Sequence, residues 1–247
     1  MFVVRSNFSC NLKGISPAIP YWPYCQTLVG IKKNNDTMTA IDLIATSLNR
    51  RDDNPNQDLA IEIIRSKRND WVKELVDNLK HKDKNIQSDC IKVLYEIGER
   101  GSADMIAPYC KNFGDILKSK NNRLVWGSMI ALDTITLINP KEVYDLLPII
   151  ISTIDNGSVI SIDHGVGIIA QLTSIEAYAE TTFPLLIEQL KKCPAKQLPM
   201  YAEKSMIAIN LANQNQFVDL IESRISEMDR DSQKQRLNKV ISKLRKK

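Results

Sequence analysis

Four short apolar segments recur at a nearly constant spacing along this chain of 247 residues. Their third residues are 38, 39 and 38 positions apart, and each segment lies in a stretch with helical apolar spacing. The segments are Ile91-Lys92-Val93, Met129-Ile130-Ala131, Ile168-Ile169-Ala170 and Met206-Ile207-Ala208. A period of about 40 residues filled by two helical patterns is typical of an α-solenoid, in which helix pairs bury their apolar faces against their neighbours. The sequence therefore predicts an all-α fold of stacked helical hairpins.

Short breaker segments separate the predicted helices. A first hairpin, which does not fit the repeat phase, is expected at residues 39–49 and 58–67, where Thr39 and Asp42 form an acidic variant of a capping box. The repeats that follow are predicted to pair residues 70–80 with 85–100, 103–118 with 122–138, 141–154 with 158–174, and 176–192 with 199–213. Because the connections are short, successive helices should pack antiparallel.

Prolines mark the same place in three of these units. Pro108, Pro148 and Pro184 are 40 and 36 residues apart and lie inside the first predicted helix of their repeats, where they predict a shared bend. Paired helices of this length with a proline in the first helix resemble HEAT repeats, relatives of armadillo repeats, over residues 56–229. The resemblance implies a right-handed α-α superhelix of about four to five hairpins that binds partners on a concave face without chemistry of its own.

The composition fits a helical array and argues against other classes. Apolar residues make up 43% of the chain, and only nine glycines occur. The five cysteines, Cys10, Cys25, Cys90, Cys110 and Cys193, form an odd set without close pairs, which indicates neither a disulfide framework nor a zinc ribbon. We therefore expect a reducing, cytoplasmic location. No apolar run reaches the roughly 18 residues that a membrane span needs, so none is expected.

No residue pattern indicates chemistry. The sequence shows no catalytic constellation, metal-ligand cluster or phosphate-binding loop, so we expect no enzymatic activity, cofactor or metal. Asp163-His164 places a histidine beside an acid, but adjacent helical residues point about 100° apart and cannot face one site together. Asp163 is interpreted as an acid that favours a helix N-terminus, and His164 as a partly exposed surface residue.

The net charge of +4 belongs to the ends of the chain. Residues 230–247 hold eight Lys or Arg and one acid, and residues 1–37 hold four Lys or Arg and one acid. Residues 38–229 therefore carry 21 bases against 27 acids. Because a phosphate backbone is repelled by an acidic surface, nucleic acid is a disfavoured partner for the body of the protein.

The chain divides into three segments. Residues 1–37 contain Pro17, Pro20 and Pro23, show no sustained period and do not resemble a signal peptide; we expect a disordered leader or a mis-assigned start before Met38. Residues 38–229 form the predicted HEAT-like domain. Residues 230–247 are predicted to form a basic amphipathic helix.

Candidate partner-binding residues follow from the repeat register. With Val93, Ala131, Ala170 and Ala208 as the zero of each second helix, positions −5 and +2 share one face. These positions hold Ser88 and Tyr95, Trp126 and Asp133, Gly165 and Leu172, and Glu203 and Asn210, with Arg123, His164, Tyr201 and Lys204 nearby. If the second helices line the inner surface, the eight residues expected to contact a protein or peptide are Tyr95, Arg123, Trp126, Asp133, His164, Tyr201, Glu203 and Asn210. Trp126 has a second interpretation, which is to fill the gap between neighbouring repeats.

The C-terminal helix also has two interpretations. Leu237, Val240, Ile241 and Leu244 follow helical apolar spacing, and basic residues occupy most of the other positions. The helix either caps the last repeat with this apolar stripe or reaches an acidic surface such as nucleic acid, anionic lipid or a partner protein.

The leading hypothesis is a non-enzymatic scaffold for an unidentified protein or peptide. The alternative is nucleic-acid binding similar to that of HEAT-like DNA glycosylases, which would require basic residues on successive inner helices. Here Arg123 and Lys204 are offset by Asp133 and Glu203. A third hypothesis is a lyase-type HEAT protein that acts on a tetrapyrrole or another modified substrate, although no residue in the sequence indicates one.

Overall fold

The computed structural model describes residues 38–246, which contain twelve α-helices, several short 3₁₀ turns and no strand. The helices are α1 (Asn54–Ser66), α2 (Asn69–Asp77), α3 (Lys84–Ile97), α4 (Cys110–Ile116), α5 (Asn122–Ile135), α6 (Pro140–Asp145), α7 (Leu147–Asn156), α8 (Val159–Thr173), α9 (Glu176–Lys192), α10 (Leu198–Ser205), α11 (Gln214–Arg224) and α12 (Asp231–Leu244). The prediction of an all-α fold is confirmed for this part of the chain. The leader expected at residues 1–37 lies outside the described residues.

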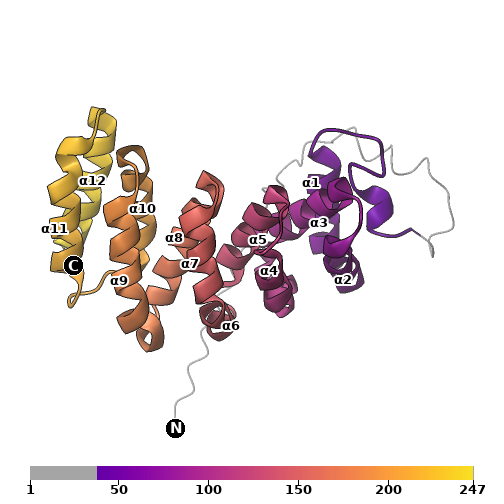
Figure 1. The fold of residues 1–247 in the computed structure, drawn as a ribbon, viewed down its shortest axis with the longest axis horizontal. Coiled ribbons are helices and arrows are strands. Elements are labelled where there is room, and N and C mark those ends of the chain that lie inside the picture. Colours follow the sequence, from indigo (N-terminus) through magenta and orange to yellow (C-terminus); the bar gives the residue numbers. More distant parts are fainter. Residues whose placement is uncertain (1–37, 247) are drawn as a thin grey trace, which may run out of the picture. The chain divides into compact units, whose positions relative to one another are not determined.

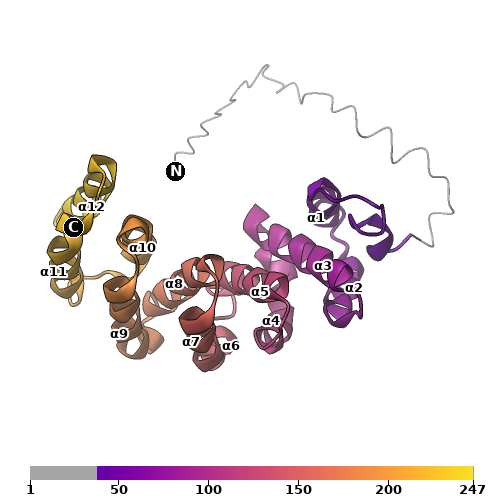
Figure 2. The same ribbon diagram turned by 45° about the horizontal axis from the view of Figure 1, so that its top comes forward.

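The helices form two layers (Figures 1 and 2). In one layer, which we call the central row, α1, α3, α5, α8, α10 and α12 follow one another, and each contacts the next. In the second layer, α2 packs on α3, α4 on α5, α7 and α9 on α8, and α11 on α12. The central row thus brings together helices that are separated by about one repeat period in the sequence.

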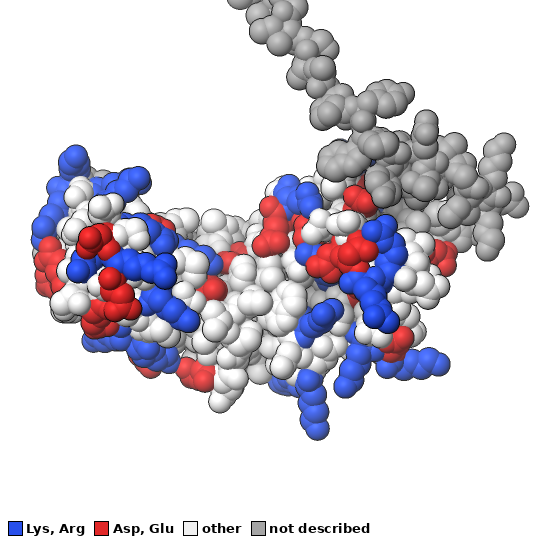
Figure 3. All heavy atoms as spheres, turned by 90° about the horizontal axis from the view of Figure 1, so that it is seen from above, with Lys and Arg blue, Asp and Glu red and all other residues white. Residues whose placement is uncertain are grey.

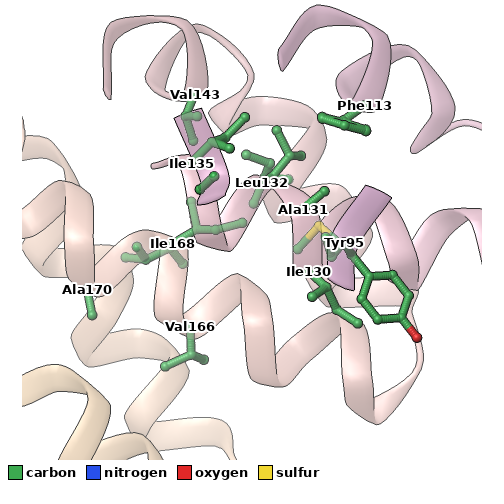
Figure 4. Packing of buried hydrophobic residues seen from close by; sticks show 14 of the residues in the cluster. Tyr95, Phe113, Ile130, Ala131, Leu132, Ile135, Val143, Val166, Ile168 and Ala170 are labelled. Atoms are coloured by element: carbon green, nitrogen blue, oxygen red, sulfur yellow. The ribbon is translucent and has the colours of Figure 1, made fainter. Parts of the chain in front are cut away.

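The recurrent segments of the sequence lie on consecutive members of the central row. Val93, Ala131 and Ala170 lie in α3, α5 and α8, and Ala208 lies in the 3₁₀ turn Met206–Ala208 that follows α10. All four side chains are buried. Figure 4 shows the core around α5, with buried side chains from both layers pointing into the same space. The constant spacing in the sequence therefore corresponds to one buried position repeated along the row.

The predicted helix at residues 39–49 is wrong. The chain forms only the short 3₁₀ turn Ile41–Leu43 and becomes extended at Ile44, where ψ is 158°. The backbone N–H of Ala45 donates to Asn56 Oδ1 at 2.9 Å, and that of Thr46 donates to Asp89 Oδ2 at 2.7 Å. These side chains, from α1 and α3, satisfy backbone donors that a helix would otherwise satisfy itself.

The three repeated prolines do not produce one common bend. Pro108 lies in the 3₁₀ turn Ala107–Tyr109 before α4, and Pro148 lies in the first turn of α7, just after α6 has ended. A proline at a helix start leaves no hydrogen bond unmade, because the first N–H groups have no partner within the helix. Pro184, in contrast, lies inside α9, which continues through it. The predicted first helix is therefore interrupted at two of the three positions and continuous at the third, so the shared bend is not formed.

The second helix of the fourth repeat is shorter than predicted. α10 ends at Ser205, and after the 3₁₀ turn the chain is extended at Ile209, where φ is −94° and ψ is 121°. The Asn213 side chain donates to the Ala208 carbonyl at 3.0 Å and accepts from the Asn210 N–H at 2.9 Å. These local bonds stabilise a turn where the sequence predicted a helix that continues to residue 213.

α12 docks on the end of the array. Its four apolar residues Leu237, Val240, Ile241 and Leu244 are all buried, and the helix contacts both α10 and α11. This arrangement agrees with the capping interpretation of the C-terminal helix, because the apolar stripe covers the last helices of both layers.

We expect Leu237→Ala to destabilise the protein by about 2–5 kcal/mol, since it leaves a cavity beneath α12. Leu237 has no exposed surface. The measurement is the urea-unfolding transition followed by circular dichroism. The matched control is Asn238→Ala at the next, exposed position, expected to change stability by less than about 0.5 kcal/mol. Equal effects of the two substitutions would contradict the docking of α12.

Candidate partner-binding face

Asp133 joins three helices of the central row. From α5, its Oδ2 atom lies 2.7 Å from His164 Nδ1, and its Oδ1 accepts from Gln171 Nε2 at 2.6 Å. His164 and Gln171 both belong to α8, two turns apart. Lys204 Nζ of α10 lies 3.9 Å from Asp133 Oδ2. The carboxylate is only 16% exposed, so these partners compensate for its partial loss of hydration.

Gly167 makes room for this carboxylate. A Cβ atom at position 167 would lie 2.5 Å from Asp133 Oδ1 and 2.9 Å from Asp133 Oδ2. Real Cβ atoms do not approach oxygen so closely, and two partners on α8 hold the Asp133 side chain in place. The glycine therefore allows α5 and α8 to approach with an acid between them.

Asp163 and His164 face different partners, as expected for adjacent residues of a helix. Asp163 Oδ1 accepts from Tyr201 Oη at 2.7 Å, and the Asp163 carbonyl accepts from Lys204 Nζ at 2.8 Å. Burial raises the pKa of Tyr201, and the hydrogen bond to Asp163 raises it further. The acid that orients His164 is Asp133, 31 positions earlier in the chain.

An aromatic pair beside a charged cluster links α3 to α5. Lys92 Nζ lies 2.6 Å from Glu96 Oε1 and 4.8 Å from the centre of the Tyr95 ring. The Tyr95 ring packs on Trp126 of α5, with ring centroids 5.8 Å apart and a tilt of 54°.

At the other end of the row, an ion pair links α10 to α12. Arg236 donates two hydrogen bonds to the Glu203 carboxylate, at 2.9 and 2.6 Å. The hydrogen bond from Arg236 lowers the pKa of Glu203, and the charges of Lys239 and Lys243 lower it further. Because both partners are more than 40% exposed, the pair contributes little to stability.

The eight residues predicted to contact a partner differ in accessibility. Arg123, Glu203 and Asn210 are exposed, and Trp126, Asp133 and His164 are half-buried. Tyr95 and Tyr201, in contrast, are 6% and 1% exposed. The structure therefore corrects the expectation for these two tyrosines, because their side chains are buried between neighbouring helices. Trp126 fills part of the gap between α3 and α5 and keeps part of its surface accessible.

Arg123 borders a cleft of about 490 Å³ near the start of the central row. The cleft carries charges of both signs: its lining also includes Arg50 and Arg51 and the acids Asp52, Asp53 and Asp89. Arg50 pairs with Asp52, whereas Arg123 forms no ion pair among the described residues. Arg123 and Trp126 are one turn apart on α5. They combine an available guanidinium with a partly accessible aromatic ring.

Sequence reasoning missed most of the bonds in this network, although a signal for them exists. Asp133 and Gln171 are 38 residues apart, and so are Asp163 and Tyr201. Both separations equal one repeat period, so each pair joins nearly equivalent positions of neighbouring units. A search for complementary polar residues at this spacing would have found both pairs.

Among residues 38–246, no group of three or more His, Cys, Asp or Glu side chains is arranged to hold a metal ion. In the same part of the chain, no helix has both the length and the apolar character to cross a bilayer.

Comparisons with known proteins show the fold alone. No protein-family model matches the sequence, and no curated protein matches it. Two crystal structures of engineered proteins, both Northeast Structural Genomics Consortium targets, are similar to the structure. One is 14% identical with a TM-score of 0.55, over 85% of this chain and 98% of its own length. The other is 15% identical with a TM-score of 0.57, over 84% of this chain and 58% of its own length.

We expect Gly167→Ala to destabilise the protein by about 1–3 kcal/mol, because the new methyl group collides with Asp133. At an unhindered position inside a helix, the same change is stabilising by roughly 0.5–1 kcal/mol. In the background of Asp133→Ala, the collision is removed and Gly167→Ala should be neutral or stabilising. Unfolding free energies of the wild type, both single variants and the double variant form the cycle. Additive effects would contradict the contact.

Proposed function

We propose that residues 38–229 form a HEAT-like α-solenoid, a right-handed superhelix of helical hairpins that α12 caps. Three observations support the proposal: the repeat period of the sequence, the continuous central row, and the buried repeat positions Val93, Ala131, Ala170 and Ala208. In such arrays each unit contacts its neighbours in sequence, which leaves a long surface available for binding.

We propose that the protein is a non-enzymatic scaffold that binds a protein or peptide on the concave face of this array. The observation that carries the proposal is the pair Arg123 and Trp126 on α5. Arginine and tryptophan are enriched among the residues that dominate the energy of protein interfaces. Trp126 is preorganised by its contact with Tyr95, so little side-chain entropy is lost when a partner covers it.

The surroundings of His164 support a structural role rather than catalysis. Within residues 38–246, Asp133 is the one hydrogen-bond partner of the His164 ring, and no Ser, Thr or Cys side chain bonds to it. A general base must reach the proton that it abstracts, and an activated nucleophile normally lies within hydrogen-bond distance. The bonds of Asp133, His164 and Gln171 instead hold α5 against α8.

Protein is a better partner than nucleic acid because acids accompany the bases along the central row. Asp133, Asp163 and Glu203 lie on consecutive row helices, and each accepts bonds from the basic or polar groups nearby. A duplex binds where basic residues of the protein neutralise its phosphates. The acids of this mixed surface would repel those phosphates.

We also propose that the protein is located in the cytoplasm. Cys90, Cys110 and Cys193 are free, buried thiols. Burial raises the pKa of all three, that of Cys110 to about 12, so they remain protonated and unreactive. Such thiols persist without pairing in a reducing compartment.

Affinity capture from the native host, followed by reconstitution with the purified captured protein, tests the scaffold. We expect Arg123→Ala combined with Trp126→Ala to weaken that binding by about tenfold or more. The matched control is Tyr109→Ala combined with Lys111→Ala, which changes the same kinds of side chain beside and on α4 in the second layer. Circular dichroism confirms that both variants are folded. If the α5 variant binds as tightly as the control, the proposed binding surface is wrong.

A further inference from the structure

α12 carries a basic stripe on the side that its apolar residues leave free. All four basic residues of this side are exposed: Arg236, Lys239 and Lys243 follow the spacing of one helix face, and Lys246 lies in the turn just after α12. We call these four residues the α12 basic stripe. At 1.5 Å per residue, its helical part from Arg236 to Lys243 extends for about 10 Å.

The acids of the neighbouring helices do not neutralise this stripe. Arg236 pairs with Glu203 of α10, whereas Lys239, Lys243 and Lys246 form no ion pair among the described residues. The hydrogen bond from Arg236 lowers the pKa of Glu203, and the charges of Lys239 and Lys243 lower it further. The other acid that bonds to α12, Glu222 of α11, pairs with Arg245 outside the stripe.

Two exposed apolar residues follow Glu203, the ion-pair partner of Arg236, in the chain. Ile207 follows Glu203 by about one turn in the α10 segment and is 51% exposed, and Leu211 in the next loop is 81% exposed. Charged side chains of both signs gather at the two ends of the described residues in Figure 3, and the left end is the one that carries α11 and α12. The middle of the same view carries few charges.

We propose that the α12 basic stripe binds an acidic segment of a partner protein, with Ile207 and Leu211 available to its apolar side chains. This inference rests on the proposed scaffold function and names the chemistry of one part of the partner. Complementary charge on the segment would be attracted by three lysines without ion pairs among the described residues, two on α12 and one just after it. Apolar side chains in the segment would cover surface that α10 and its following loop leave exposed.

The structure favours a protein segment over a membrane or a nucleic acid. A helix that binds at a membrane surface inserts its apolar face, but Leu237, Val240, Ile241 and Leu244 of α12 are already buried in the protein. A nucleic acid that continues from α12 along the central row would meet Asp163 and Asp133. A short acidic segment needs only the stripe itself.

The probe is a fluorescein-labelled synthetic peptide of about five repeats of Glu-Glu-Leu, measured by fluorescence anisotropy with the full-length protein at roughly 0.15 M ionic strength. We expect saturable binding that weakens by about tenfold or more in the variant Lys239→Glu, Lys243→Glu, Lys246→Glu. The matched control is Lys80→Glu, Lys111→Glu, Lys191→Glu. It makes the same change in net charge at exposed lysines, one after α2 and two on the second-layer helices α4 and α9. This control should bind within about twofold of the wild type.

Three outcomes would overturn the inference: no binding of the acidic peptide, equal loss in the two variants, or tighter stripe-dependent binding of duplex DNA or phosphatidylserine vesicles than of the peptide. The scaffold proposal is judged separately, through Arg123 and Trp126. If the captured partner loses affinity in the α5 variant but not in the stripe variant, the scaffold is supported and the acidic segment is rejected.

Discussion

Apolar burial between successive helices of the central row holds the array together. α5 and α8 are the clearest cases, because each is covered by two neighbours in the row and by helices of the second layer. Their buried positions follow one another on almost every turn, from Leu124 to Ile135 and from Ser161 to Thr173. No helix of this kind can bury its apolar surface alone, so the stability of each unit depends on the unit beside it.

Polar bonds across the row select one register among the arrangements that apolar burial would permit. Asp133 fits against Gly167 and bonds to His164 and Gln171, and Asp163 bonds to Tyr201 in the next unit. A shift of one helix by a turn would leave these half-buried groups without partners, which is costly in a low-dielectric environment. The same bonds occupy the acid and the histidine that, in another setting, would suggest chemistry. The bonds that fix the register therefore also support a structural rather than a catalytic role for His164.

The surfaces proposed for binding consist of side chains that the packing of the helices leaves accessible. At α5, Trp126 is held by Tyr95 while Arg123 remains available. At α12, burial of the apolar stripe turns a helix that could have bound a membrane into a cap, and it leaves the basic stripe as the accessible feature. The apolar face of α12 thus covers the end of the helical array, while its basic face remains exposed to solvent.

The sequence by itself determined the helical class, the repeat period and most helices from Asn54 onward, because apolar periodicity and breakers are local signals. Tertiary structure alone decided the rest. Residues 39–49 do not form the predicted helix, because the side chains of Asn56 and Asp89 accept hydrogen bonds from their backbone N–H groups. Tyr95 and Tyr201 are buried because neighbouring helices cover them. The spacing of residues fixes the direction of a side chain about its own helix axis. What lies in that direction, whether solvent, Asp133 or another helix, depends on where the next unit packs.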